Sequence, residues 1–172
     1  MGFNHLPDTA VWALAALLAF AAVHDVATFR IPNWLNGLIA GTFPVVAIAA
    51  SAPVDWLGHA GAGVLTLVVG MVLFQLRAFG GGDVKLLAAT AVWTGFGALL
   101  PFVLYVGLIG GGLTLLLLLL RRNLMPLAAQ MAPGLSRAWP RVLTPGEKIP
   151  YGVAIAAAGI LTALRAAALP AG

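Results

Sequence analysis

The chain has 172 residues, of which 62% are hydrophobic and only 8% are charged, and it contains no cysteine. Soluble domains carry about 25% charged residues, so this composition excludes an ordinary water-soluble globule and favours a membrane protein of several spans. The absence of cysteine excludes disulfides, thiolate metal sites and a cysteine nucleophile.

Six apolar segments follow one another along the chain. They predict an all-α polytopic membrane protein with about six transmembrane helices, at residues 9–29, 34–50, 58–77, 84–98, 101–120 and 150–169. We expect residues 1–172 to form a single integral membrane domain, with residues 121–148 as a cytoplasmic loop. This loop carries five basic residues among apolar side chains, which predicts contact with the anionic inner leaflet rather than with nucleic acid.

The stretch from Val84 to Leu120 contains one charged residue, Lys85. As a single helix it would be about 55 Å long, whereas the hydrocarbon core of a bilayer is roughly 30 Å thick. The stretch must therefore fold back on itself. Gly95, Gly97 and Pro101 are the residues expected to form the turn.

The basic residues are distributed unevenly over the loops of this topology. If the N-terminus faces outward, eight of the nine lysines and arginines fall on the inner side, and only Arg165 falls near the outer face. Cytoplasmic loops are enriched in basic residues. The sequence therefore predicts a multi-pass protein of the cytoplasmic (inner) membrane with its N-terminus outside.

Two of the five acidic residues are expected at the inner edge of the hydrocarbon region. Asp25 follows the apolar run of the first span, and Asp83 begins the fourth span directly after Gly80, Gly81 and Gly82. An ionisable side chain in a membrane span is costly and therefore suggests a functional site. A structural role, in which each aspartate pairs with a nearby Arg or Lys, is the alternative for either residue alone.

Two carboxylates that share a site hold one proton between them, because both cannot ionise comfortably. The ionised member can take a proton from water, while the protonated member donates a hydrogen bond to a scissile carbonyl. This chemistry of an aspartyl peptidase needs no metal, cofactor or covalent intermediate. Which aspartate is the base stays open, because the titration belongs to the pair. The three glycines would let a substrate strand approach closely, or they form an ordinary turn.

Other catalytic mechanisms lack their parts. The three histidines, His5, His24 and His59, are scattered and form no H-E-x-x-H motif, and the two serines, Ser51 and Ser136, have no evident base. Two functions of other classes remain as alternatives. One is a small proton-coupled transporter that uses the aspartates as a relay. The other is a non-catalytic assembly subunit of a pilus or secretion system.

Three motifs resemble those of the prepilin peptidases, the G-x-G-D intramembrane aspartyl peptidases of peptidase family A24. An aspartate, Asp25, is followed by Ile31-Pro32-Asn33, and Gly80-Gly81-Gly82-Asp83-Val84-Lys85 is similar to the family's G-x-G-D-x-K motif. Pro150-Tyr151-Gly152, at the start of the last span, is similar to the P-[YF]-G motif. The three occur in the family's order and cover almost the whole chain.

The resemblance implies a prepilin peptidase that removes the basic leader of type IV prepilin or pseudopilin precursors at the cytoplasmic membrane face. It implies that Asp25 and Asp83 are the catalytic pair. The residues implied to bind substrate or shape the site are Gly80, Gly82, Lys85, Ile31, Pro32, Asn33, Pro150, Tyr151 and Gly152. Lys85 has the alternative of a snorkelling lysine, and Asn33 that of a helix cap.

The chain lacks the cysteine-containing cytoplasmic insertion of the larger family members. It resembles the short, peptidase-only form of Flp-type (tight-adherence) pilus assembly, so no N-methyltransferase activity is expected. The sequence leaves the oligomeric state open.

Overall fold

The computed structural model describes residues 8–49, 54–124, 126–127, 130, 141–144 and 146–168. Most of the predicted cytoplasmic loop at 121–148 lies outside the described residues, so its contact with the inner leaflet stays a prediction.

The described ranges contain helices and no strand, which confirms the all-α fold class. The α-helices are α1 (Asp8–Thr28), α2 (Asn33–Ala49), α3 (Trp56–Gln75), α4 (Gly81–Leu119) and α6 (Tyr151–Ala168). A π-helical turn at Leu120–Leu124 continues α4, and a 3₁₀ turn at Arg141–Leu143 lies between it and α6.

Four of the helices are long and apolar enough to cross a membrane. They are α1, α3, α6 and the continuous helical stretch Gly81–Asn123, whereas α2 is apolar but shorter. Helices suit this composition because a lipid-exposed backbone has to satisfy its N–H and C=O groups within the segment. The helices overlap the six predicted segments, while the number of membrane crossings stays a prediction.

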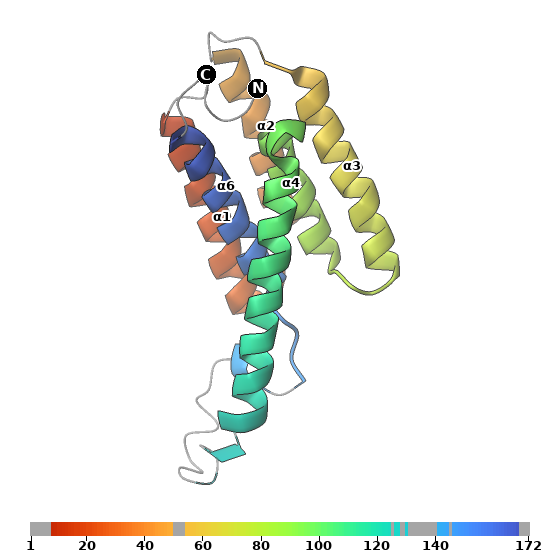
Figure 1. The fold of residues 1–172 in the computed structure, drawn as a ribbon, viewed down its shortest axis with the longest axis vertical. Coiled ribbons are helices and arrows are strands. Elements are labelled where there is room, and N and C mark those ends of the chain that lie inside the picture. Colours follow the sequence, from red (N-terminus) through yellow and green to blue (C-terminus); the bar gives the residue numbers. More distant parts are fainter. Residues whose placement is uncertain are drawn as a thin grey trace.

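The chain reverses its direction within α4, at Gly95. This residue has φ 58° and ψ −178°, whereas its neighbours on both sides are helical. Residues 81–94 (the first arm) lead up to the reversal. Residues 96–119 (the second arm) run back from it and extend beyond the start of the first arm (Figure 1). A Cβ placed on Gly159 of α6 would meet both Thr90 of the first arm and Phe102 of the second. Pro101 and Gly97 lie within the second arm and do not form the turn.

Replacement of Gly95 by alanine is expected to destabilise the protein by about 1–3 kcal/mol, because this region of φ and ψ is restricted to glycine. The new methyl group would also lie 3.1–3.2 Å from ring atoms of His59, whose Nδ1 is hydrogen-bonded to Val92 O at 2.7 Å. Gly97→Ala is the matched control, since its Cβ would meet no heavy atom within 4 Å. Thermal unfolding in detergent measures both, and equal midpoints for the two variants would contradict the assignment.

The core lies between α1, α2, both arms of α4, and α6. Its fully buried large side chains include Leu14, Leu18, Leu35, Ile39, Leu86, Trp93, Phe102 and Ile155. Many large apolar side chains are instead exposed on the outside of the bundle, as expected for a surface that faces lipid. The end of α1, the start of α2, the loop from α3 to α4, and the start of α6 meet at one end of the bundle, and α4 extends beyond them (Figure 1).

Candidate active site

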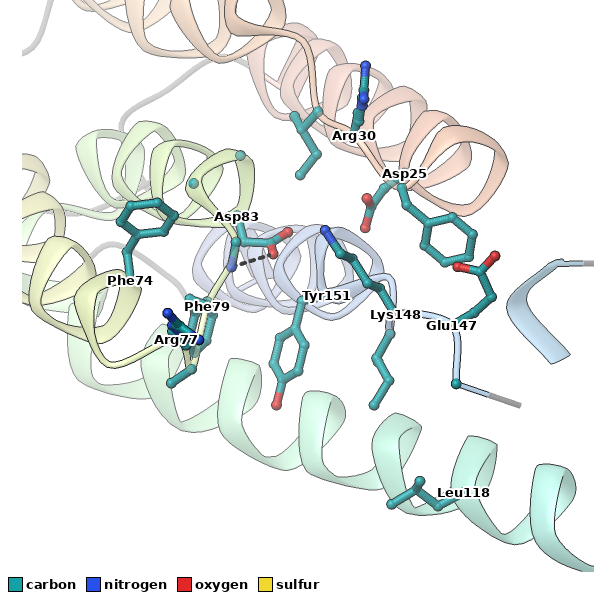
Figure 2. Close-up of a pocket in the computed structure, with 18 of the residues that line it drawn as sticks. Asp25, Arg30, Phe74, Arg77, Phe79, Asp83, Leu118, Glu147, Lys148 and Tyr151 are labelled. Atoms are coloured by element: carbon teal, nitrogen blue, oxygen red, sulfur yellow. Dashed lines mark hydrogen bonds between the residues drawn. The ribbon is translucent and has the colours of Figure 1, made fainter. Parts of the chain in front are cut away.

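A cavity of about 1240 Å³ lies at this end of the bundle. Its walls come from the end of α1 and the following turn, the loop between α3 and α4, the far end of α4, and the segment that leads into α6. The lining residues include Asp25, Ile31, Phe74, Phe79, Gly80, Gly81, Gly82, Asp83, Leu118, Glu147, Lys148, Ile149 and Tyr151. Figure 2 shows this cavity with both aspartates directed into it.

Asp25 lies in the last turns of α1 and is only 4% exposed. Its Oδ2 accepts a hydrogen bond of 2.8 Å from the backbone N–H of Gly152, in the first turn of α6. The N–H groups of a first helical turn have no partner within the helix, and the helix dipole favours negative charge there. The start of α6 therefore holds the Asp25 carboxylate in place and stabilises its ionised form.

Asp83 is placed in a similar way at the start of α4. It is the third residue of the helix, and its Oδ2 accepts a hydrogen bond of 3.2 Å from the backbone N–H of Gly80. The carboxylate thereby caps its own helix. Both carboxylates thus lie against a helix N-terminus, that of α6 for Asp25 and that of α4 for Asp83, which is a favourable environment for an anion in an apolar protein.

The two carboxylates face the same space from different helices (Figure 2). Among the described residues no hydrogen bond joins them to each other. The Lys148 amine points into the region between them, and Asp25 and Lys148 are both close enough to Asp83 for their charges to act on it. The cation offsets part of the repulsion between two carboxylates in one site.

The glycines of the motifs lie where a side chain would not fit. A Cβ on Gly152 would lie 2.7 Å from Asp25 Oδ2, and one on Gly80 would lie 2.7 Å from Asp83 Oδ2. A Cβ on Gly82 would lie 3.3–3.5 Å from atoms of Ile31. The first turn of α4 thus packs closely on the turn after α1, and this contact brings the two aspartates to one cavity.

The turn after α1 is fixed by local contacts. Phe29 has a positive φ of 53°, and its N–H donates to Asp25 O. The Thr28 hydroxyl donates to the carbonyls of His24 and Arg30, and His24 Nδ1 lies 2.8 Å from Arg30 O. His24 therefore shapes this turn and does not enter the cavity.

Five of the predicted site residues are not among those that line the cavity: Pro32, Asn33, Lys85, Pro150 and Gly152. Lys85 donates a hydrogen bond of 2.8 Å to Asn33 Oδ1, and neither residue lines the cavity of the aspartates. Pro32 also lies outside it. The structure thus pairs Asn33 of the first motif with Lys85 of the second, outside the cavity.

The residues of the third motif lie against Asp25 and the far wall of the cavity. Pro150 is buried just before α6, and Gly152 binds Asp25 as described. The ring of Tyr151 packs on Phe79, with ring centroids 4.9 Å apart, and a Cβ on Gly110 would lie 2.7 Å from it. Tyr151 therefore fills the space between the loop before α4 and the second arm.

The sequence did not single out Arg121, which was counted only as one of the inner basic residues. The side chain is 8% exposed and donates to three backbone carbonyls: to Val142 O at 2.6 and 3.1 Å, to Glu147 O at 2.8 Å and to Lys148 O at 3.1 Å. It thereby ties Val142, Glu147 and Lys148 to the π-helical turn that continues α4. A lone arginine after an apolar run gives no sequence signal for such a role.

We expect Arg121→Gln to loosen the segment that carries Lys148 into the cavity. Hydrogen bonds from a charged donor contribute about 1.5–3 kcal/mol each, so amide exchange at 146–149 should accelerate by at least about tenfold. The cleavage rate should fall with it. Arg165→Gln is the control, because Arg165 is exposed and donates only to Tyr105 Oη at 2.8 Å in the described part of the chain. Unchanged exchange at 146–149 in Arg121→Gln would contradict this role.

The arrangement offers two carboxylates, an adjacent cation and an open cavity large enough for an extended peptide. Within the described ranges, no group of three or more His, Asp or Glu side chains is placed to hold a metal ion. The chemistry that these residues can perform by themselves is the activation of a water molecule by one carboxylate, with hydrogen-bond donation by the other.

Comparison with known proteins assigns the family. The model of the type IV leader peptidase family matches residues 12–115, more than half of the chain, including both aspartates and the motifs around them. No curated protein and no solved structure matches the chain. From the match over residues 12–115 and the apolar all-α fold, we conclude that the chain belongs to the type IV leader peptidase family of proteases.

Proposed function

We propose that the chain is an aspartyl endopeptidase that cleaves the leader peptide from type IV prepilins. The observation that carries this proposal is that Asp25 and Asp83, from two different helices, line one cavity at the same end of the bundle. Each carboxylate is held by a backbone N–H. The family membership supports a leader peptide as the substrate class.

In the proposed reaction, a water molecule between the carboxylates attacks the scissile carbonyl carbon. The ionised aspartate takes the proton of the water, and the protonated aspartate donates a hydrogen bond to the carbonyl oxygen. The tetrahedral intermediate then collapses, the C–N bond breaks, and the leaving amine receives the proton. Gly80, Gly81 and Gly82, at the start of α4, have no side chains that would prevent an extended peptide from reaching this water.

The proposed enzyme is a peptidase without N-methyltransferase activity, of the kind associated with Flp-type pili. Only residues 29–32 separate α1 from α2, so no further domain is inserted there, and the sequence contains no cysteine. We expect the new N-terminus of the product to be unmethylated.

The active site is proposed to face the cytoplasm. Arg30, Arg77, Arg121 and Arg122 all line the cavity, so the basic residues gather at the end of the bundle where the aspartates lie. By the positive-inside rule, this distribution supports an orientation with this end on the inner side of the inner membrane.

The test is cleavage of a purified Flp-type precursor by the purified protein in liposomes. Both fragments are identified by mass spectrometry, and a single cut that releases the basic leader is the expected result. Binding of the precursor without cleavage would favour an assembly subunit. Proton flux across the liposome membrane without cleavage would favour a transporter, and either outcome would overturn the proposal.

A further inference from the structure

A second cavity, a groove of about 820 Å³, lies between α2, α3 and the first arm of α4. Both α2 and α3 are tied to the first arm: Trp93 Nε1 donates to Ile39 O at 2.6 Å, and His59 Nδ1 lies 2.7 Å from Val92 O. The groove is the space that these two contacts leave between α2 and α3. Its lining is mostly apolar, and it opens to the side of the bundle, where the membrane would lie.

The two ends of the groove differ. At the end far from the aspartates, Phe43 of α2 stacks on His59 of α3 with ring centroids 4.4 Å apart, and Trp56 lies 6.2 Å from Phe43. At the other end the lining includes Asn33 and Lys85. These lie two residues after Ile31 and Asp83, which line the active-site cavity. The groove therefore ends next to the catalytic pair.

The lining has the composition of a helix-binding surface in a membrane. Gly37 and Ala40 of α2, Ala60 and Gly63 of α3, and Ala88 and Ala89 of α4 all line it. Small residues let helix backbones approach closely, and transmembrane helices associate through such surfaces.

Asn36 gives an independent indication of a missing partner. It lines the groove and is 5% exposed, yet neither its Oδ1 nor its Nδ2 has a hydrogen-bond partner in the described part of the chain. An unpaired buried amide costs free energy, and in a membrane it favours a neighbour that offers hydrogen-bonding groups. A segment in the groove with hydrogen-bonding groups that reached this amide would remove that cost.

We propose that this groove binds the apolar segment that follows the cleavage site of the substrate, as a transmembrane helix. The inference rests on the proposed peptidase function. It gives Asn33 and Lys85 a role that the catalytic cavity does not, since both line the groove and lie close in sequence to residues of that cavity. A lipid acyl chain and a second copy of the chain are the competing occupants.

The first test fills the groove from α2. Gly37 lines the groove, and a Cβ there meets no heavy atom within 4 Å, so Gly37→Phe is designed to add a ring on the groove side of α2. Gly41→Phe is the matched control, because Gly41 lies one turn further along α2, has the same free space and does not line the groove. Cleavage is measured with a full precursor and with a truncated one that lacks the apolar segment.

We expect Gly37→Phe to raise the KM for the full precursor by at least about tenfold while kcat changes little, and Gly41→Phe to behave like the unaltered protein. Truncation of the precursor should raise the KM of the unaltered protein similarly. The two effects should not add, because the substitution and the truncation remove the same interaction. Normal cleavage of the full precursor by Gly37→Phe would overturn the proposal, as would an equal loss on both substrates. Failure of the unaltered protein to cleave either substrate would instead refute the peptidase function itself.

Crosslinking tests the groove without filling it. The chain has no cysteine, so Val64→Cys in the groove and Leu108→Cys on the second arm, 61% and 72% exposed before replacement, each give a single thiol. In the Asp83→Asn background, a precursor with a cysteine in its apolar segment should crosslink to position 64 and not to position 108. Equal crosslinking at both positions, or crosslinking of position 64 only to a second copy, would contradict the assignment.

Discussion

Asp25→Asn and Asp83→Asn are each expected to lower the rate of precursor cleavage by at least about a thousandfold, within the range attributed to general acid–base catalysis. Asparagine keeps the size of the side chain and one oxygen that can accept the N–H of Gly152 or Gly80. It cannot take a proton from water or donate one in the same way. The double variant should be no slower than the slower single variant, because the two carboxylates act as a unit.

The measurement is a time course of precursor processing, with the amount of each variant in the membrane determined in parallel. Asp55→Asn is the control, since Asp55 also caps a helix, by accepting from Gly58 N at 2.9 Å, but lies at the start of α3 and outside the cavity. It should process precursor at the normal rate. Near-normal processing by Asp25→Asn or Asp83→Asn would refute the two-carboxylate mechanism.

The second large effect is expected from a single methyl group. In Gly152→Ala the Cβ would lie 2.7 Å from Asp25 Oδ2 and 2.9 Å from Ile31 Cδ1. These separations are too short for non-bonded atoms, so Asp25 has to move away from the N–H of residue 152. A displacement of about 1 Å in a catalytic group can cost roughly a hundredfold in rate, and we expect at least that loss in kcat.

Alanine variants of two other glycines serve as controls that distinguish a loss of catalysis from a loss of stability. A Cβ on Gly107 meets no heavy atom within 4 Å, so Gly107→Ala should keep both kcat and the unfolding temperature. A Cβ on Gly159 would lie 2.8 Å from atoms of Leu18 and Thr90 in the core, so Gly159→Ala should lower the unfolding temperature more than it lowers kcat. The outcome to compare is the loss of kcat relative to the loss of unfolding temperature in each variant. If this ratio were the same for Gly152→Ala and Gly159→Ala, the specific effect on Asp25 would be disproved.

The sequence predicted the fold class from its composition together with the length of its apolar segments. A chain with 8% charged residues needs lipid around it, and a lipid-exposed backbone must be helical or part of a closed barrel. The fold-back of residues 84–120 followed from length alone, and the glycine at which the chain reverses, Gly95, was among the expected turn residues. The expectation that Gly97 and Pro101 take part in the turn was wrong, because the second arm continues helically through both.

The candidate site was only partly predictable. The depth of Asp25 and Asp83 along their helices followed from hydropathy, whereas the bond from Gly152 to Asp25 joins residues 127 positions apart. No periodic pattern shows which faces of apolar helices meet. The resemblance to the family grouped Lys85 and Asn33 with the aspartates, and in the structure they bind each other beside the groove.

By itself, then, the sequence determined a helical membrane protein with two aspartates near the same end of the bundle. Only the tertiary structure decided that both line one cavity, that the first turn of α6 holds Asp25, and that Arg121 fixes the segment carrying Lys148. The reason is physical. Hydrophobicity determines how deep a residue lies in the membrane, but the rotation of each helix about its axis depends on close packing at positions such as Gly82 and Gly152, where a neighbouring side chain occupies the space of the missing Cβ.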